Sequence, residues 1–340
     1  MTDLHETARA LVASGRGILA ADESSGTIKK RFDAIDVEST EENRRAYRDL
    51  LFTTEGAEEF ISGAILYDET IRQSSADGTS FPKLLESKGI IPGIKVDTGA
   101  KPLAGATGET VTEGLDGLRE RLEEYRELGA RFTKWRAVIA IGDGRPSEYA
   151  LWTNAHALAR FAALSQEAGL VPIVEPEVLM DGAHDIHTSY VVTERTQRAV
   201  FTELFDQRVE REGMLLKPNM VLSGYDADDR ADVRTVAEQT IRCLANTVPA
   251  AVPGIVFLSG GQTDEDATAH LNAMNALGPH PWELAFYYGR ALQAPALKAW
   301  RGETANVEAA QKAFYRRAKF NGAARTGSYA PEWEKEEVAV

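Results

Sequence analysis

Lysine and carboxylate side chains follow several short apolar runs of this sequence, in a pattern suited to carbonyl chemistry. Lys217 leaves the apolar run Met214-Leu215-Leu216, and Pro218 after it favours an extended backbone at the lysine. A lysine amine attacks a carbonyl carbon only when neutral, whereas its free pKa is about 10.4. Burial lowers that pKa, and so does a nearby second cation. We therefore take Lys217 as the candidate nucleophile.

Two further strand-like segments carry charges at alternate positions. Lys134 and Arg136 flank one tryptophan, and Glu175 and Glu177 flank one proline. Alternate side chains of a strand point to the same face, so each pair shares a face. At about 4 Å and an effective dielectric of about 20, two cations repel by about 4 kcal/mol, or roughly three pKa units. Lys134 is thus a candidate second cation for Lys217, and the two glutamates are candidate proton donors and acceptors.

Glycine, serine and arginine residues near the last two apolar runs predict a phosphate site. Ser259-Gly260-Gly261 offers a hydroxyl and exposed backbone N–H groups, and Gly289-Arg290 adds a planar guanidinium. A second anionic subsite across the same opening is expected from basic and hydroxyl groups elsewhere: Lys95, Ser25, Thr27 and Arg31. Arg31 and its neighbour Lys30 have an alternative interpretation as a solvated helix face.

Eight apolar or β-rich runs recur at the spacing of strand-helix units and must position these groups. Helix-like segments separate most of them, which predicts a parallel sheet. We expect a single-domain α/β protein, a (β/α)8 TIM barrel over residues 1–330, followed by a short acidic C-terminal tail over 331–340. An open doubly wound sheet is the alternative, but no Gly-x-Gly-x-x-Gly follows the first strand. The predicted strands are Gly17–Ala21, Phe60–Tyr67, Ile90–Val96, Arg131–Ile141, Leu170–Pro176, Gly213–Asn219, Gly254–Ser259 and Leu284–Tyr288.

Three stretches carry helix signals. Ser39-Thr40-Glu41-Glu42 has the pattern of a capping box. Apolar residues recur at helical spacing from Leu115 to Leu128 before Gly129, and again over 233–244. Cys243 lies on or beside the second apolar stripe, so we expect a packed, inert thiol.

Composition excludes several function classes. The 340 residues hold 38 basic and 52 acidic side chains, a net charge of -14, which argues against nonspecific binding to nucleic acid or anionic membranes. The lone cysteine and the absence of an apolar signal core at the N-terminus predict a cytoplasmic protein. His184 and His187 flank Asp185 without a third His or Cys nearby, so we predict no catalytic metal and no cofactor.

At these residues the sequence resembles class I fructose-1,6-bisphosphate aldolases. The matching stretches run in order over most of the chain, up to about Tyr329. They are Gly17-Ile-Leu-Ala-Ala-Asp-Glu-Ser-Ser-Gly26, Thr40-Glu-Glu-Asn-Arg-Arg45, Gly93-Ile-Lys-Val-Asp97, Lys134-Trp-Arg136, Val174-Glu-Pro-Glu177, Leu215-Leu-Lys-Pro-Asn-Met220, Leu258-Ser-Gly-Gly-Gln262 and Tyr288-Gly-Arg-Ala-Leu-Gln293.

The resemblance implies a metal-independent Schiff-base lyase of glycolysis and gluconeogenesis with a (β/α)8 barrel. By position, Lys217 matches the Schiff-base lysine, Glu175 the acid/base that dehydrates the carbinolamine, and Asp22 the carboxylate near the C4 hydroxyl. Lys134 matches a second lysine that assists the carbinolamine steps, and Glu177 and Arg136 belong to the surrounding network. The C1-phosphate site matches Ser259, Gly260, Gly261, Gly289 and Arg290, and the other phosphate or sugar chain matches Lys95, Ser24, Thr27 and Arg31. The family is commonly homotetrameric.

Some positions depart from the family pattern. Thr27 stands where serine is common, and Thr98 replaces a frequent lysine. Tyr287 replaces a serine beside the C1-phosphate residues, so we expect it to line and reshape that pocket. Animal members have a longer tail that ends in tyrosine, whereas this sequence ends at Val340. Substrate preference therefore stays open between a bisphosphate and another ketose phosphate, and a scaffold barrel without catalysis is the remaining alternative.

Overall fold

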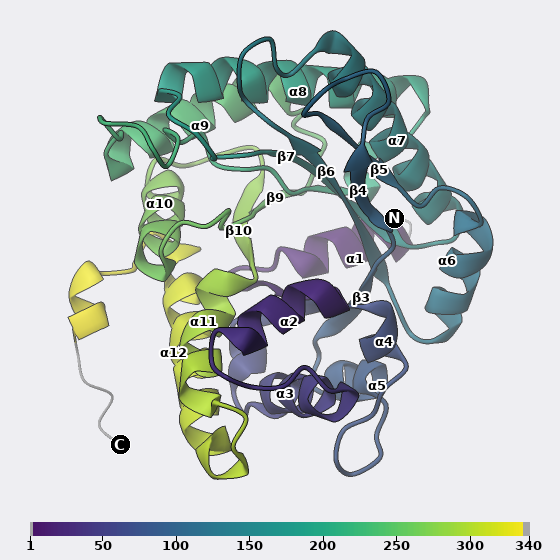
Figure 1. The fold of residues 1–340 in the computed structure, drawn as a ribbon, viewed down its shortest axis with the longest axis vertical. Coiled ribbons are helices and arrows are strands. Elements are labelled where there is room, and N and C mark those ends of the chain that lie inside the picture. Colours follow the sequence, from purple (N-terminus) through teal and green to yellow (C-terminus); the bar gives the residue numbers. More distant parts are fainter. Residues whose placement is uncertain (1–2, 336–340) are drawn as a thin grey trace.

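Eight parallel strands form a closed barrel in the computed structural model, which describes residues 3–335. Their order around the barrel is β1-β10-β9-β8-β7-β6-β3-β2, and helices surround them (Figure 1). This confirms the predicted (β/α)8 fold over the open-sheet alternative. The strands are β1 (Gly17–Ala21), β2 (Ile61–Leu66), β3 (Ile91–Lys95), β6 (Phe132–Ile139), β7 (Val171–Val178), β8 (Leu215–Leu216), β9 (Gly254–Phe257) and β10 (Glu283–Tyr288).

All eight predicted strands are present, with two informative differences in length. β7 continues through Pro176 to Val178, since it pairs with β6 along its whole length, from Phe132↔Val171 to Ile139↔Val178. β8 is only two residues long. The Lys217 N–H still donates to the Val174 carbonyl at 2.8 Å, but Pro218 has no N–H and the ladder stops there.

Helices alternate with the strands as predicted, but two of them begin at a different residue than expected. Thr40, and not Ser39, caps α3, because its hydroxyl accepts a hydrogen bond from Asn43 N. α6 starts at Leu118 and not at Leu115, after Gly117 in a left-handed conformation. The α-helices are α1 (Asp3–Leu11), α2 (Ser25–Asp33), α3 (Glu41–Thr53), α4 (Asp68–Ile71), α5 (Phe81–Ser87), α6 (Leu118–Glu127), α7 (Glu148–Glu167), α8 (Ile186–Asp206), α9 (Val233–Thr247), α10 (Asp264–Ala276), α11 (Arg290–Trp300) and α12 (Val307–Ala324).

One sheet was not predicted. β4 (Gly99–Pro102) and β5 (Thr110–Glu113) form an antiparallel hairpin between β3 and α6. The Thr112 hydroxyl donates to the Arg136 carbonyl at 2.6 Å, so the hairpin contacts β6 near the predicted site. It lies beside the carboxyl ends of the strands, in front of the barrel in Figure 1.

The first residues of the predicted tail pack on the barrel. A 3-10 turn, η4 (Pro331–Lys335), places Trp333 against Phe320 and Tyr329, and Glu334 pairs with Arg317. Residues 336–340 lie outside the described part of the chain. A boundary at residue 330 therefore stays a prediction.

The barrel interior is apolar at its centre and closed at its amino end. Inward side chains from all parts of the barrel form one cluster, which includes Ile18, Phe132, Leu215 and Tyr287. At the amino end, the buried Arg325 guanidinium donates to the carbonyls of Val12, Ala13, Arg16 and Leu284. In this fold the catalytic groups usually lie at the other end, at the carboxyl ends of the strands. Within residues 3–335, no helix combines the length and apolar character needed to cross a membrane.

Candidate active site

A buried lysine–carboxylate–lysine arrangement lies at the carboxyl ends of β6, β7 and β8. The Lys217 amine is 2.9 Å from Glu175 Oε1, and the Lys134 amine is 3.5 Å from Glu175 Oε2. The three residues are only 3 to 6 % exposed. β7 brings Glu175 between the two lysines because it lies between β6 and β8 in the barrel. The structure thus unites the predicted nucleophile, acid/base and second cation.

Burial is the main reason that the Lys217 amine is a weaker base than usual. It lowers the pKa of Lys217, and Lys134 lowers it further, while Glu175 and Asp22 act in the opposite direction. The balance is a pKa below the ordinary lysine value. The second cation acts with the sign predicted from the sequence, but removal from water is the larger cause.

Glu175 is held as a carboxylate despite its burial. Burial alone would raise the pKa of Glu175, but Lys217, Lys134 and Arg136 outweigh it and lower the pKa. Its Oε1 accepts from Lys217, while Oε2 is buried with no hydrogen-bond partner. Glu175 can therefore take a proton from the Lys217 amine on Oε1, while Oε2 is able to accept a hydrogen bond from a third group.

Asp22 completes the cluster from the end of β1. Its carboxylate is 2.8 Å from the Lys134 amine. Burial favours the neutral acid, but Lys134 and Lys217 outweigh that effect and lower the pKa of Asp22 to about 2. The same contacts raise the pKa of Lys134 against the effect of burial. Asp22 is thus a fixed anion and Lys134 a fixed cation at neutral pH.

The outer rim of the cluster contains two more ion pairs. Arg136 pairs with Glu177 across β6 and β7, above the lysines. Lys95 is 2.6 Å from Asp97, and it also donates to the Asp97 carbonyl at 2.9 Å. Asp97 in turn lies 4.0 Å from the Lys134 amine. Lys95 therefore joins the charge network through Asp97.

Arg31 lies at the barrel mouth and not on a solvated helix face. Its guanidinium pairs with the buried Glu23, which also binds the buried Arg48 at 2.6 Å. A Cβ atom built on Gly289 would be 3.5 Å from Arg31 Nη2. Arg31 therefore borders the end of β10, next to the predicted C1-phosphate residues, and not the far side of the mouth. Lys30, by contrast, is exposed.

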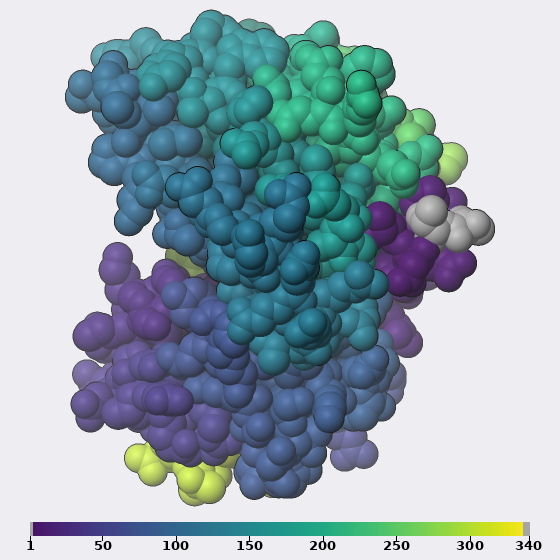
Figure 2. Space-filling view, turned by 90° about the vertical axis from the view of Figure 1, so that its right-hand side faces the viewer, coloured from purple at the N-terminus to yellow at the C-terminus, as the bar shows by residue number. Residues whose placement is uncertain are grey.

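Hydroxyl groups mark the start of α2 at the same side of the mouth. Ser24 Oγ and Thr27 Oγ1 are 3.1 Å apart, and Thr27 and Ser25 are exposed. The helix and the β4–β5 hairpin form the two sides of the notch at the left-hand edge of Figure 2. The open end of the barrel thus has polar groups on both walls.

The loop after β9 presents its backbone to Arg290. Ser259 is buried, and Gly260 and Gly261 have φ values of 58° and 103°, which only glycine adopts readily. A Cβ atom on Gly261 would be 2.8 Å from Arg290 Nη2 and 2.3 Å from the Tyr225 hydroxyl. The predicted C1-phosphate residues are therefore adjacent, with the guanidinium beside the glycine loop.

Tyr287 lies below the lysines and not in the wall of the glycine loop. Its ring centroid is 3.7 Å from the Lys217 amine nitrogen, and its side chain is 1 % exposed. Its hydroxyl has no hydrogen-bond partner among the described residues. The sequence identified the position but not the contact.

Four residues of the site received no role from the sequence. Asp97 and Glu23 were visible as charges at strand ends, and they hold Lys95 and Arg31 respectively. The Tyr225 hydroxyl donates to the Gly260 carbonyl, and the Gln262 side chain donates to the Ser259 carbonyl at 3.1 Å. Gln262 stood in the glycine-loop motif, whereas no local signal pointed to Tyr225.

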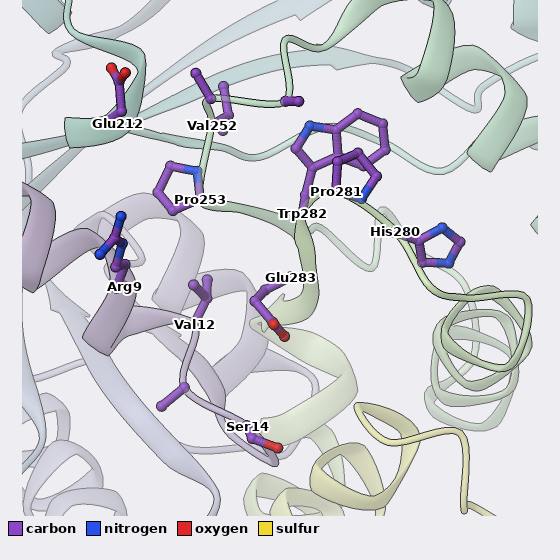
Figure 3. Close-up of a pocket in the computed structure, with 13 residues that line it drawn as sticks. Arg9, Val12, Ser14, Glu212, Val252, Pro253, His280, Pro281, Trp282 and Glu283 are labelled. Carbon is purple, nitrogen blue, oxygen red and sulfur yellow. The ribbon is translucent and has the colours of Figure 1, made fainter.

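One cavity lies apart from this chemistry. A cavity of about 450 Å³ opens at the amino end of the barrel, lined by residues such as Arg9, Trp282 and His280 (Figure 3). None of the predicted site residues lines it. Within the described chain, no group of three or more His, Cys, Asp or Glu side chains is arranged to hold a metal ion. Cys243 is fully buried, and burial raises its pKa to about 12, as expected for an inert thiol.

Comparisons with known proteins agree over nearly the whole chain. The family model "Fructose-bisphosphate aldolase class-I" matches residues 3–339. A "Probable fructose-bisphosphate aldolase class 1" from Xylella fastidiosa is 61% identical over 96% of this chain and 98% of that protein. "Fructose-bisphosphate aldolase 4, cytosolic" from Arabidopsis thaliana is 56% identical over 93% of this chain and 80% of its own length.

A solved structure confirms the architecture. The fructose-bisphosphate aldolase of Plasmodium falciparum, crystallised with TRAP and a small-molecule inhibitor, superposes with a TM-score of 0.95. It is 50% identical and covers 96% of this chain and 95% of its own. These relatives set aside the scaffold barrel and the other ketose phosphates as alternatives. The enzyme is an aldehyde-lyase that reversibly cleaves fructose 1,6-bisphosphate to dihydroxyacetone phosphate and glyceraldehyde 3-phosphate, and the chain belongs to the family of class I fructose-bisphosphate aldolases.

Proposed function

We propose that Lys217 carries the reaction as a Schiff base with C2 of the ketose. The observation behind this proposal is the buried Lys217 amine, 2.9 Å from Glu175 and beside the fixed cation Lys134. A proton passed from the amine to Glu175 leaves a neutral nucleophile and a neutral acid. Glu175 then returns the proton to the hydroxyl that leaves as water, so that the carbinolamine becomes an iminium.

Cleavage follows because the iminium accepts electrons from the C3–C4 bond. Asp22, kept ionised by Lys134, accepts the proton of the C4 hydroxyl, and glyceraldehyde 3-phosphate leaves first. The remaining enamine is protonated at C3 and hydrolysed to dihydroxyacetone phosphate. Lys134 assists the carbinolamine steps by holding charge near the departing oxygen, and Arg136 and Glu177 keep the surroundings in place.

The phosphorylated sugar is held by two groups of residues at the mouth. Ser259, Gly260, Gly261, Gly289 and Arg290 bind the C1 phosphate through backbone N–H groups and the guanidinium. Lys95, Ser24 and Thr27 serve the sugar chain and the other phosphate. The short separation of Arg31 and Gly289 supports a role for Arg31 close to the first group. Tyr287 forms part of the floor of the site.

Borohydride trapping tests the nucleophile directly. Incubation with dihydroxyacetone phosphate and borohydride is expected to attach the reduced substrate to one lysine, which peptide mass spectrometry identifies as Lys217. Lys217→Met should lose both the adduct and the activity, whereas Lys95→Met should keep the adduct at Lys217. An adduct at Lys134, or full activity in Lys217→Met, would refute the proposal.

The same chemistry needs no metal, so EDTA is expected to leave the activity unchanged. The iminium supplies the electron sink that a metal supplies in other carbonyl reactions. The measurement is the cleavage rate after dialysis against EDTA, with a metal-dependent lyase treated in parallel. Loss of activity that Zn²⁺ restores would count against the Schiff base.

We further propose a cytoplasmic homotetramer. Tyr149 and Trp152 of α7 and Phe205 of α8 are large apolar side chains with 52%, 42% and 68% of their surface exposed, and the two helices are neighbours. Exposed apolar groups on adjacent helices are suited to contacts between subunits. Sedimentation equilibrium should give four times the 37.2 kDa chain mass, and Trp152→Lys should shift it towards smaller species. A monomer at micromolar concentration would end this part of the proposal.

A further inference from the structure

An aromatic ring faces the reacting nitrogen from inside the barrel. Along β10, Ala285 and Tyr287 belong to the inner cluster, whereas Phe286 and Tyr288 belong to the outer one. Alternation thus turns Tyr287 inward, below the end of β8. Its ring centroid lies 3.7 Å from the Lys217 amine nitrogen, well inside the usual range of a cation–π contact.

We propose that the π face of Tyr287 stabilises the cationic forms of the Lys217 nitrogen, the ammonium and the iminium. The ring raises the pKa of the ammonium, and it favours the iminium over the neutral amine and the neutral carbinolamine. This inference rests on the proposed Schiff base. The negative face of an aromatic ring attracts a cation but gains little from a neutral amine. The contact is buried, and cation–π interactions are strongest when they are removed from water. Tyr287 therefore contributes to the chemistry through its ring.

The hydroxyl of Tyr287 is not the acting group. Burial raises the pKa of Tyr287, and Asp22 and Glu175 raise it further. The phenol therefore stays protonated and cannot serve as a base at neutral pH. Removal of the hydroxyl alone should then leave the charge on Lys217 unchanged, whereas removal of the ring should not.

The other groups around the Lys217 nitrogen also affect its pKa, so a variant that removes the ring must leave them unchanged. Glu175 of β7 and Asp22 after β1 raise the pKa of Lys217, whereas burial and Lys134 of β6 lower it. Asp97 and Lys95 belong to the same network at the end of β3. Tyr287→Leu keeps all these charges and an apolar filling. The loss of the ring alone should therefore lower the pKa of Lys217.

The pH profile gives the first test. We expect the acid limb of kcat/KM to move about 0.5 to 1.5 pH units lower in Tyr287→Leu, and to stay in place in Tyr287→Phe. If Tyr287 only fills space, its replacement would admit water, and hydration of the ammonium would raise the pKa of Lys217. The acid limb of kcat/KM would then move to higher pH. A limb that stays in place or rises in Tyr287→Leu would overturn the inference.

Trapping gives the second test. At a pH above the acid limb of kcat/KM, free Lys217 is neutral and only the iminium is charged. There the dihydroxyacetone phosphate concentration for half-maximal borohydride trapping at Lys217 should rise about threefold to thirtyfold in Tyr287→Leu. Tyr288→Leu is the matched control, because Tyr288 is equally buried on β10 but points outward and donates to the Ala267 carbonyl. It should show the wild-type concentration. An equal rise in both variants would overturn the inference.

A third test keeps an aromatic ring at position 287, in case the Tyr287→Leu variant does not fold. Phenylalanine with increasing fluorination at position 287 keeps the shape while it weakens the negative face. The half-maximal concentration should then rise stepwise with fluorination, and no trend would overturn the inference. Absence of any adduct in the wild-type enzyme would instead refute the Schiff base itself, so the two failures are distinguishable.

Discussion

The charge on the Lys217 nitrogen decides what this site can do, and burial together with three charged neighbours sets that charge. Lys217 is pulled towards the neutral amine by burial and Lys134, and towards the ammonium by Glu175 and Asp22. Glu175 touches both lysines, so it is the group through which their protons are coupled. A change at any one of these positions should move the titration of the lysine in a direction that can be stated beforehand.

Lys134→Met should move that titration upward. The variant removes a cation that lowers the pKa of Lys217, so the pKa rises and the acid limb of kcat/KM moves to higher pH. Asp22 also loses its 2.8 Å partner, so its pKa rises as well. Lys134→Arg keeps the charge and should stay near the wild-type limb. Steady-state rates from pH 5 to pH 9 give the position of the acid limb in each variant. A move of the limb to lower pH in Lys134→Met would contradict the prediction.

Glu175→Gln should separate binding from dehydration. The amide cannot return a proton to the leaving hydroxyl, so the iminium forms slowly, and we expect kcat to fall about 100-fold to 10,000-fold. A carbinolamine is not reduced by borohydride, so trapping at Lys217 should fall in parallel while the substrate still binds. Isothermal titration with dihydroxyacetone phosphate measures the remaining binding. Undiminished trapping would show that another group expels the water.

At the scale of elements, α10 holds the phosphate loop through a chain of hydrogen bonds. His270 Nδ1 is 2.6 Å from Gln262 Oε1, and the Gln262 amide donates to the Ser259 carbonyl. Since the amide oxygen can only accept, Nδ1 carries the hydrogen. The helix after β9 thus fixes the loop that precedes it, and a buried histidine is part of that support.

This histidine should make stability depend on pH. Burial disfavours the imidazolium and lowers the pKa of His270 from 6.5 to about 4. The unfolded chain therefore binds more protons between these values, and the free energy of unfolding falls by about 3 kcal/mol as pH drops from 6.5 to 4. His270→Gln should flatten that decline. Urea unfolding at pH 7, 6, 5 and 4 checks it, and an unchanged slope in the variant would contradict the assignment.

The elements also show why sequence patterns predicted most of this fold and less of the site. Apolar runs such as Gly17–Ala21 are buried on both faces, and their spacing indicates repeated strand-helix units. The absence of Gly-x-Gly-x-x-Gly after the first strand then favoured a barrel over an open sheet. The β4–β5 hairpin has short strands of four residues each without a run of apolar residues, and β4 is largely exposed, so the sequence did not predict it. Charges at strand ends revealed Lys134, Glu175 and Lys217 together. The ring of Tyr287 under the amine was not predictable, because distances across the barrel depend on the closed structure.

At the scale of the whole molecule, the negative net charge contrasts with the basic side chains at the mouth, three of which are paired with Glu23, Asp97 and Glu177. The chain has a net charge of -14, which repels a bisphosphate, whereas the mouth gathers Arg31, Lys95, Arg136 and Arg290. Exposed charges beyond about 10 Å are screened at 0.1 M salt, while charges in contact with the substrate are screened less. The response to salt therefore shows which field dominates capture of the substrate.

We expect the local field to dominate, so that kcat/KM falls as salt rises from 0.02 M to 0.3 M. Attraction to cations in a narrow opening weakens with screening, whereas repulsion by a distributed negative surface would be relieved and kcat/KM would rise. Arg290→Gln should reduce the salt dependence as well as the affinity, since it removes a cation beside the glycine loop. Glu120→Gln, an exposed residue of α6, serves as the control for a change of one charge unit away from the mouth. Rates that rise with salt would mean that the overall negative charge controls the encounter, and the basic groups at the mouth would then act only after the substrate has arrived.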